Sequence, residues 1–249
     1  MNLDRIIAVR NDKTVFRDGD RCIKLFNGNY SKSDILNEAR NHVILEESGL
    51  NVPRFMEITQ INGKWAIVSE YIFGKTLAQL MEEHPENKEA YIGLLIDLQL
   101  SVHSRTGRLL NRLKDQLARR IDSADLPATV RYFLLSRLED MRRHEQICHG
   151  DFTPTNIIVS EKGKPYIIDW SHASLGNGTA DAARTYLLMW MRGKIDQASM
   201  YLDLFCSKTG TGKESIMEWM PIVAASQYAK CSEKEREFLL SWINDVHHK

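Results

Sequence analysis

The hydrophobic repeat of the chain changes near residue 75, and this change limits the folds that the chain can adopt. From Ile6 to Leu25, and again over residues 51–74, β-branched and apolar residues alternate with polar ones, which is the period of a strand. From Thr76 to about Glu145 the apolar residues recur at helical spacing, most regularly in "EAYIGLLIDLQLSVHSR". We therefore expect an α+β protein that begins with a small antiparallel sheet and continues as a mainly α unit.

Turn and capping signals divide these regions into elements. "DGD" and Asn62-Gly63 predict two tight hairpins. Between them, "SKSDILNEARNHVILEESG" predicts one helix with Ser33 or Asp34 as its N-cap and Gly49 as its stop. A further helix is expected to begin at a proline in "PATVRYFLLSRLEDMRRHE", since proline favours the first helical position.

A short hairpin follows the first helices of the α-rich region. The strands "NIIVS" and "PYIIDW" are joined by "EKGK", and helices are expected from there to Lys249. This order predicts two lobes, an N-terminal nucleotide-binding lobe over residues 1–73 and a C-terminal catalytic and acceptor-binding lobe over residues 74–249.

Composition excludes several classes of partner. The chain has 33 basic and 33 acidic residues, so no net charge draws it to nucleic acid or to an anionic membrane. No apolar run approaches the roughly 18 residues that a membrane-spanning helix needs. The four cysteines lie far apart without a C-x-x-C pair, which argues against a zinc site and a disulfide framework. We expect a cytoplasmic protein without nucleic-acid, membrane or obligate protein partners.

The segment "HGDFTPTN" carries the strongest chemical signal. Asp151 precedes Asn156 by the spacing of a kinase catalytic loop, in which the aspartate accepts a hydroxyl proton and the asparagine binds magnesium. Asp169 follows the apolar run "YII" at the end of the next strand. Carboxylate and amide oxygens suit Mg²⁺, which takes one or two carboxylates together with phosphate oxygens. The segment therefore predicts a proton acceptor beside a metal site.

Two charged residues upstream complete this set. Lys24 stands on a predicted strand in "CIKLF", and Glu38 stands on the helix that follows. Such a pair can form the ion pair that holds a lysine on the α- and β-phosphates of ATP. Taken singly, a strand lysine is as often a solvated edge residue, and a helix glutamate is usually exposed surface.

The ordered set of Lys24, Glu38, "VSEYIFG", "HGDFTPTN" and "IIDW" resembles the aminoglycoside phosphotransferase and choline kinase-like family, over roughly residues 5–190. The resemblance implies a two-lobed protein-kinase-like fold that binds ATP and Mg²⁺. It also implies that His149-Gly150-Asp151 is the catalytic sequence, that Asp169-Trp170 opens the metal-binding loop, and that Asp181 braces the catalytic loop. The implied hinge, which offers backbone groups to the adenine, consists of Ser69, Glu70 and Tyr71.

The chain departs from the family pattern in two places. Arg184-Thr185-Tyr186 stands where the family usually has Asp-Leu-Ala, and the first hairpin lacks a G-x-G-x-x-G. The residues themselves also indicate roles for His149 and Asp181. His149 is expected to orient the loop, because no second histidine lies at metal-ligand spacing. Asp181 could brace the loop or cap the helix after "GNGT".

These features predict an enzyme that moves the γ-phosphoryl group of ATP to a hydroxyl of a small molecule. A kinase-like module that binds nucleotide without turnover is the alternative, and a protein kinase is disfavoured because only "SHASLGNGT" separates Asp169-Trp170 from Asp181. Family members often phosphorylate cationic alcohols such as choline and aminoglycosides, so an amino alcohol or amino sugar is the expected acceptor. Aromatic and acidic residues that could hold its ammonium group are Tyr186, Trp190, Tyr201, Trp219, Asp196, Asp203, Glu214 and Glu218.

Overall fold

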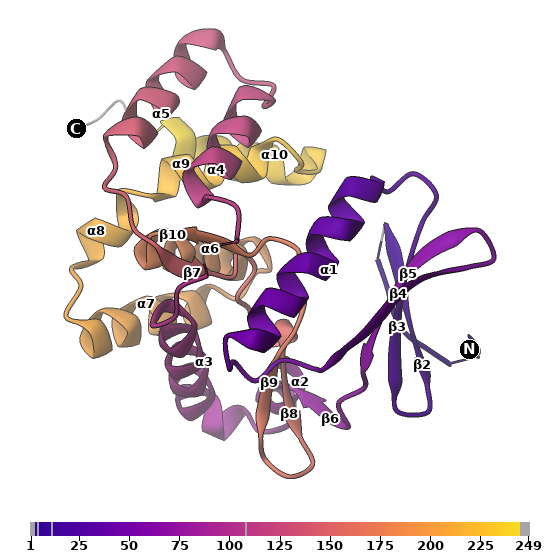
Figure 1. Ribbon diagram of the computed structural model, residues 1–249. Coiled ribbons are helices and arrows are strands. Elements are labelled where there is room, and N and C mark those ends of the chain that lie inside the picture. Colours follow the sequence, from indigo (N-terminus) through magenta and orange to yellow (C-terminus); the bar gives the residue numbers. More distant parts are fainter. Residues whose placement is uncertain (1–2, 4, 11, 108, 245–249) are drawn as a thin grey trace. The chain divides into compact units, whose positions relative to one another are not determined.

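The computed structural model describes residues 3, 5–10, 12–107 and 109–244 (Figure 1). The chain forms two compact units. Unit 1 comprises Met1–Pro85 and Pro154–His172, and unit 2 comprises Glu86–Thr153 and Ala173–Lys249. The fold is α+β, as the change of hydrophobic period predicted.

A five-stranded antiparallel sheet forms most of unit 1, with the strand order β1-β2-β3-β5-β4. The strands are β1 (Arg5–Val9), β2 (Lys13–Asp18), β3 (Arg21–Phe26), β4 (Phe55–Ile61) and β5 (Lys64–Glu70). Both predicted hairpins are confirmed. Gly19 joins β2 to β3 with φ of 62°, and Asn62 and Gly63 join β4 to β5 with φ of 50° and 75°. These left-handed backbone angles match the right-handed twist of the strands.

Helix α1 (Lys32–Glu47) packs on this sheet (Figure 1). The contact consists of Phe26 from β3, Ile67 from β5, and Ile35 and Ala39 from the helix. The helix begins earlier than the sequence indicated, because Ser31 is the last residue with extended backbone. The prediction of Ser33 or Asp34 as the N-cap is therefore wrong, because Ser31 takes that position and both residues lie in the first turn.

Unit 1 also contains a smaller sheet with the order β6-β8-β9. Its members are β6 (Gly74–Thr76), β8 (Ile157–Ser160) and β9 (Pro165–Ile167), accompanied by α2 (Leu77–Glu83) and the 3-10 turns η1 (Pro85–Asn87) and η2 (Pro154–Asn156). The predicted hairpin of residues 156–170 is thus present, and it pairs with a strand that directly follows residue 73. The bounds of the compact units are therefore not the predicted bounds of the lobes, 1–73 and 74–249. The functional division into a nucleotide-binding and a catalytic lobe stays a prediction.

Unit 2 is mainly helical, as predicted from the apolar spacing after Thr76. Its helices are α3 (Lys88–His103), α4 (Leu113–Asp122), α5 (Ala128–Asp140), α6 (Gly178–Met191), α7 (Ile195–Thr209), α8 (Lys213–Met217), α9 (Met220–Tyr228) and α10 (Glu233–Asn244). The antiparallel strands β7 (Gln146–Cys148) and β10 (Ser174–Gly176) were not predicted, because three residues are too few to show a period of two.

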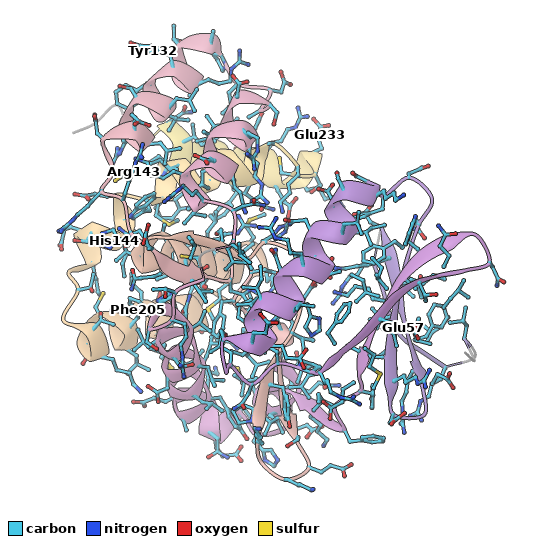
Figure 2. The ribbon with its side chains drawn as sticks, viewed as in Figure 1. Glu57, Tyr132, Arg143, His144, Phe205 and Glu233 are labelled. Atoms are coloured by element: carbon cyan, nitrogen blue, oxygen red, sulfur yellow. The ribbon has the colours of Figure 1, made fainter. Side chains whose placement is uncertain are left out.

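Packing and exposure within unit 2 follow the apolar pattern. Phe205 on α7 is buried against Tyr201 at a ring distance of 5.8 Å, whereas Tyr132 projects from α5 and is 77% exposed (Figure 2). Over the described part of the chain, no helix has both the length and the apolar character needed to cross a membrane. The four cysteines are free thiols, of which Cys148 is buried.

Gly74 should be essential to the smaller sheet. A Cβ atom added there would lie 2.1 Å from the carbonyl oxygen of Val159, so Gly74→Ala should push β6 from β8 and destabilise the protein by about 1–3 kcal/mol. Gly93 in α3 is the matched control, because a Cβ there meets nothing within 4 Å. Gly93→Ala should stabilise by about 0.5–1 kcal/mol. Thermal and urea unfolding of both variants would test this, and equal stability of the two would contradict it.

Candidate active site

Four charged side chains meet within unit 1. Lys24 on β3 donates to Glu38 on α1 and, at 3.1 Å, to the Oδ1 atom of Asp169. Lys13 on β2 donates to the same Oδ1 atom at 3.0 Å and lies 3.9 Å from Oε2 of Glu38. We call Lys13, Lys24, Glu38 and Asp169 the lysine–carboxylate cluster. The predicted pairing of Lys24 with Glu38 is present, and Asp169 lies beside it.

The sheet register explains why Lys13 joins this cluster. Lys24 pairs with Val15 across the β2–β3 hairpin, so the two side chains lie on the same face. Lys13 precedes Val15 by two residues and shares that face as well, because side chains alternate along a strand. The sequence interpretation missed Lys13. The signal that could have identified it is the "DGD" turn, because a hairpin centred there pairs Lys24 with Val15 and so places Lys13 and Lys24 on one side of the sheet.

The cluster favours the ionised forms of Asp169 and Lys24 despite their burial. Burial alone would raise the pKa of Asp169, but the ammonium groups of Lys24 and Lys13 hold it well below its usual range. Burial alone would lower the pKa of Lys24, but Asp169 and Glu38 hold it well above its ordinary value. Glu38 is 4% exposed, and within the described part of the chain its Oε2 atom has no hydrogen-bond partner. This arrangement fixes ammonium groups, which can bind phosphate, beside carboxylates, which can bind a divalent cation.

The hairpin of β8 and β9 brings the two predicted metal ligands together in unit 1. The N–H of Ile168 donates to the carbonyl oxygen of Asn156 at 2.9 Å, so Asp169 follows directly after the residue opposite Asn156. Asp169 has a φ of 64°, a left-handed angle that is uncommon outside glycine. The amide of Asn41 on α1 donates to the carbonyl oxygen of the next residue, Trp170, at 3.2 Å. This bond fixes the backbone on the far side of the turn.

The donor set fits Mg²⁺ bound together with a nucleotide. Among the described residues, no three His, Cys, Asp or Glu side chains gather where they could hold a metal ion by themselves. Asp169 supplies an ionised carboxylate, and Asn156, which is buried, supplies an amide oxygen. Magnesium keeps several waters and is usually held by one or two carboxylates plus substrate phosphates, which is the set that this hairpin offers.

The predicted hinge residues end β5 of unit 1. The N–H of Glu70 donates to the carbonyl oxygen of Arg54 at 2.8 Å, and the N–H of Tyr71 donates to that of Asp20 at 2.7 Å. Ser69 pairs with Cys22 in the ladder between β3 and β5. Because these two N–H groups are already used, the adenine contacts expected of residues 69–71 are limited to other backbone groups such as carbonyl oxygens.

A buried carboxylate organises the corresponding loop of unit 2. Asp181 on α6 accepts the N–H of Gly150 at 2.7 Å and the N–H of His149 at 3.3 Å. Its Oδ2 atom also accepts from Gln99 at 3.1 Å and lies 3.0 Å from Nε2 of His103. Burial opposes ionisation, yet the hydrogen bond and charge of His103, with the N–H of Gly150, lower the pKa of Asp181 to about 2. The geometry is that of a brace for the loop.

The alternative reading of Asp181 as a helix cap is wrong. The side chain of Asn177 caps α6 by accepting the N–H of Thr179 at 2.9 Å. Asp181 instead lies in the first turn and points its oxygens at residues 149 and 150. The carboxylate is free to make these contacts because the cap position is already filled.

Each residue of the loop His149-Gly150-Asp151 makes a contact that holds the loop in place. The buried ring of His149 accepts the N–H of Asp151 through Nδ1 at 3.1 Å, in agreement with an orienting role. Gly150 has a φ of 79°, which favours glycine, and its carbonyl oxygen accepts from Nε of Arg184. Asp151 forms an ion pair of 3.5 Å with Arg192 at the end of α6. The sequence interpretation noted Arg184 as a departure from the family but did not identify its contact with the carbonyl oxygen of Gly150.

The residues expected to hold an ammonium group are not gathered in one place. Tyr201 is fully buried and donates to Oε1 of Gln99 at 2.5 Å, and Trp219 is 3% exposed. Trp190 stacks on Phe238 at a ring distance of 6.0 Å, and Tyr186 packs against it. The four acidic residues at positions 196, 203, 214 and 218 are exposed. These aromatic side chains therefore serve the core of unit 2.

Several solved structures resemble the fold of this chain. The structure resembles an aminoglycoside-3'-phosphotransferase of type VIII, with a TM-score of 0.64 and 19% identity over 89% of this chain and 93% of that one. It also resembles a thermostable mutant of aminoglycoside phosphotransferase APH(4)-Ia, with a TM-score of 0.72 and 12% identity over 97% and 92% of the two chains. The choline kinase LicA from Streptococcus pneumoniae gives a TM-score of 0.62 and 16% identity over 98% and 95%.

These likenesses show a kinase-like fold. A search of curated proteins by sequence finds no match. A family described as the phosphotransferase enzyme family matches residues 6–219, which is most of the 249-residue chain, and the resemblance inferred from the sequence is thereby confirmed. This protein belongs to the phosphotransferase enzyme family.

Proposed function

We propose that this protein transfers the γ-phosphoryl group of ATP to a hydroxyl group of a small molecule with the help of Mg²⁺. The observation that carries the proposal is the lysine–carboxylate cluster, in which Lys24 is held between Glu38 and Asp169. Phosphoryl transfer requires little covalent chemistry from the protein, so catalysis rests on positioning and on charge. A fixed ammonium beside an ionised carboxylate supplies both.

Each predicted residue has a role in this reaction. Asp151 accepts the proton of the acceptor hydroxyl. The oxygen of that hydroxyl bonds to the γ-phosphorus, and the bond from the γ-phosphorus to the β–γ bridging oxygen breaks to leave ADP. Lys24, set by Glu38, neutralises phosphate charge. Asp169 and Asn156 would hold Mg²⁺, and the ion would supply positive charge that neutralises the phosphates. Asp181 and His149 keep the loop that carries Asp151 in shape.

Two further groups support nucleotide binding in this proposal. Lys13 adds a second ammonium beside Asp169, where the first hairpin has no glycine-rich sequence to cover the phosphates. The segment Ser69, Glu70 and Tyr71 would offer a backbone carbonyl oxygen to the adenine. Some neighbouring structures carry AMP, AMP-PNP or ADP, and APH(4)-Ia was solved with AMP-PNP and hygromycin B. A nucleotide and a small hydroxyl compound are accordingly the proposed substrates, with the cytoplasm as the proposed location.

An assay of ADP release tests this function directly. The protein, Mg²⁺ and ATP are incubated with a panel of sugars, amino sugars, amino alcohols, sugar phosphates and protein substrates. A small hydroxyl compound should stimulate ADP release and appear as its phosphate ester by mass spectrometry. A module that binds nucleotide without turnover would show Mg-ATP affinity with no stimulation by any member, and a protein kinase would respond only to the protein substrates.

Asp151 and Asp169 should have separable roles. Asp151→Asn removes the proton acceptor and should lower kcat by about 10²–10⁴-fold while Mg-ATP still binds. Asp169→Asn removes a metal ligand and should weaken Mg-ATP binding by at least about tenfold, which corresponds to about 1.4 kcal/mol. Calorimetry and steady-state kinetics would measure both. Asp196→Asn, at an exposed position, is the control, and equal loss of Mg-ATP affinity in the two site variants would contradict the assignment.

Lys24 and Glu38 should act as one unit, because Glu38 serves through its contact with Lys24. Lys24→Met and Glu38→Gln should each lower kcat/KM, and the double variant should be little worse than the worse single variant. A double-mutant cycle on kcat/KM would measure the coupling. Strictly additive losses would show that the pair does not cooperate.

Asp181 should stabilise the protein in a pH-dependent way. Its pKa of about 2 lies below the ordinary value of about 3.9, so its contribution is fully present above about pH 4 and is lost as the pH falls toward 2. Asp181→Asn should cost about 2–3 kcal/mol at pH 7, and the difference from the native protein should shrink below pH 4. Urea unfolding across this pH range would measure the difference. The exposed control Asp125→Asn should show neither effect.

A further inference from the structure

Three cationic side chains of unit 2, those of Arg184, Arg192 and Lys230, interact with Asp151, and a fourth, that of Arg120, interacts with Arg184 and Lys230. Arg192 pairs with Asp151 at 3.5 Å, and Arg184 lies within electrostatic reach of both. Lys230, just after α9, interacts with Asp151, Arg184 and Arg120, the last of which comes from α4. We call Arg120, Arg184, Arg192 and Lys230 the cationic cluster. Since α4 and α6 both pack against α9, distant parts of the chain converge on this place.

The cluster holds more positive than negative charge. Asp151 is the acidic group that interacts with three of its members, Arg184, Arg192 and Lys230. Asp181 also attracts Arg184, but its oxygens are engaged by the loop N–H groups and by Gln99 and His103. Gathering like charges with partial loss of water is unfavourable unless an opposite charge compensates. A bound anion would add to the compensation that Asp151 and Asp181 provide.

Arg184 provides an independent sign of a ligand. The residue is 4% exposed, its Nε donates to the carbonyl oxygen of Gly150, and its Nη2 donates to Oε1 of Gln227 at 3.2 Å. Its Nη1 is buried and has no hydrogen-bond partner among the described residues. A buried donor on a cation is costly to leave unpaired. The guanidinium group is also well suited to oxyanions, because its planar set of donors matches carboxylate and phosphate.

The acid–base properties of the cluster point the same way. Burial lowers the pKa of Arg120 to about 10, assisted by repulsion from Arg184 and Arg119. Lys230 is exposed as a whole residue, yet partial loss of solvent at its ammonium, followed by repulsion from Arg184 and Arg120, lowers its pKa to about 7. Both cations are thus destabilised in the free protein. A bound anion would relieve this destabilisation.

We infer that the acceptor carries an oxyanion, a phosphate, sulfate or carboxylate group, near the hydroxyl that receives the phosphoryl group, and that the cationic cluster binds it. This inference rests on the proposed function, because Asp151 is the group that accepts the hydroxyl proton. It differs from the amine-bearing acceptor expected from the family resemblance. Arg184 is the anchoring donor, and Arg120 and Lys230 add charge around it.

The first experiment measures anion binding without turnover. The protein is saturated with Mg²⁺ and AMP-PNP, so that the nucleotide occupies its own site, and inorganic phosphate is titrated against chloride at equal ionic strength by thermal shift and calorimetry. The native protein should bind phosphate, and Arg120→Gln and Lys230→Gln should each weaken this binding by about tenfold. Lys234→Gln, an exposed lysine on α10, should leave it unchanged. No phosphate binding, or binding equal in all variants, would overturn the inference.

The second experiment identifies the charge of the acceptor through turnover. ADP release is measured with matched compounds that share a skeleton, such as glucose, glucosamine, glucose 6-phosphate and gluconate, and glycerol, glycerol 3-phosphate and glycerate. The phosphate or carboxylate member should give the highest kcat/KM, and Arg120→Gln and Lys230→Gln should raise its KM. A higher kcat/KM for neutral or amine-bearing members would overturn the inference alone. Absence of Mg-ATP binding would instead overturn the proposed function, and the inference with it.

Discussion

The hydrogen bonds between the carboxylate of Asp181 and the loop of residues 149–151 are the interaction on which the site in unit 2 depends. A buried carboxylate is costly, and it is tolerated here because Gly150, His149, Gln99 and His103 surround it with hydrogen-bonding groups. Two of these groups are backbone N–H groups of the loop that carries Asp151. The cost of burying the charge is therefore offset only when the loop has its observed shape. Stability and the placement of the proposed proton acceptor come from the same contacts.

Unit 1 meets a similar demand with paired charges. In the lysine–carboxylate cluster, Lys24 and Asp169 each lower the cost of burying the other, and Glu38 ties the pair to α1. Truncating one member would leave an uncompensated buried charge, so the members are expected to be replaced together or not at all. The predicted phosphate and metal ligands thus lie in unit 1, and the predicted proton acceptor lies in unit 2. The short segment from Asp151 to Asn156 connects the two along the chain.

The sequence predicted local features well because local chemistry determines them. Asn62-Gly63 marked its hairpin since few other residue pairs adopt two successive left-handed angles. Contacts between distant segments were harder to predict. Arg184 reaches Gly150 only after α6 has packed beside the loop, and no local pattern indicates which way an arginine in an apolar helix points. Gln99 and His103 were not predicted, although a local signal exists, because two polar residues four apart on the apolar α3 share one face and both contact Asp181.

For the acceptor, composition and the inferred anion site lead to different predictions. The C-terminal region is rich in aromatic and acidic residues, a combination suited to an ammonium group, but the aromatic rings pack on one another and the acids lie on the surface. The charges that matter are few and come from separate elements, α4, α6 and the end of α9. They cancel in the net charge of zero, which describes the whole surface and not one site. Substrate charge is therefore better judged from the unbalanced charge beside Asp151 than from composition, and that imbalance is positive.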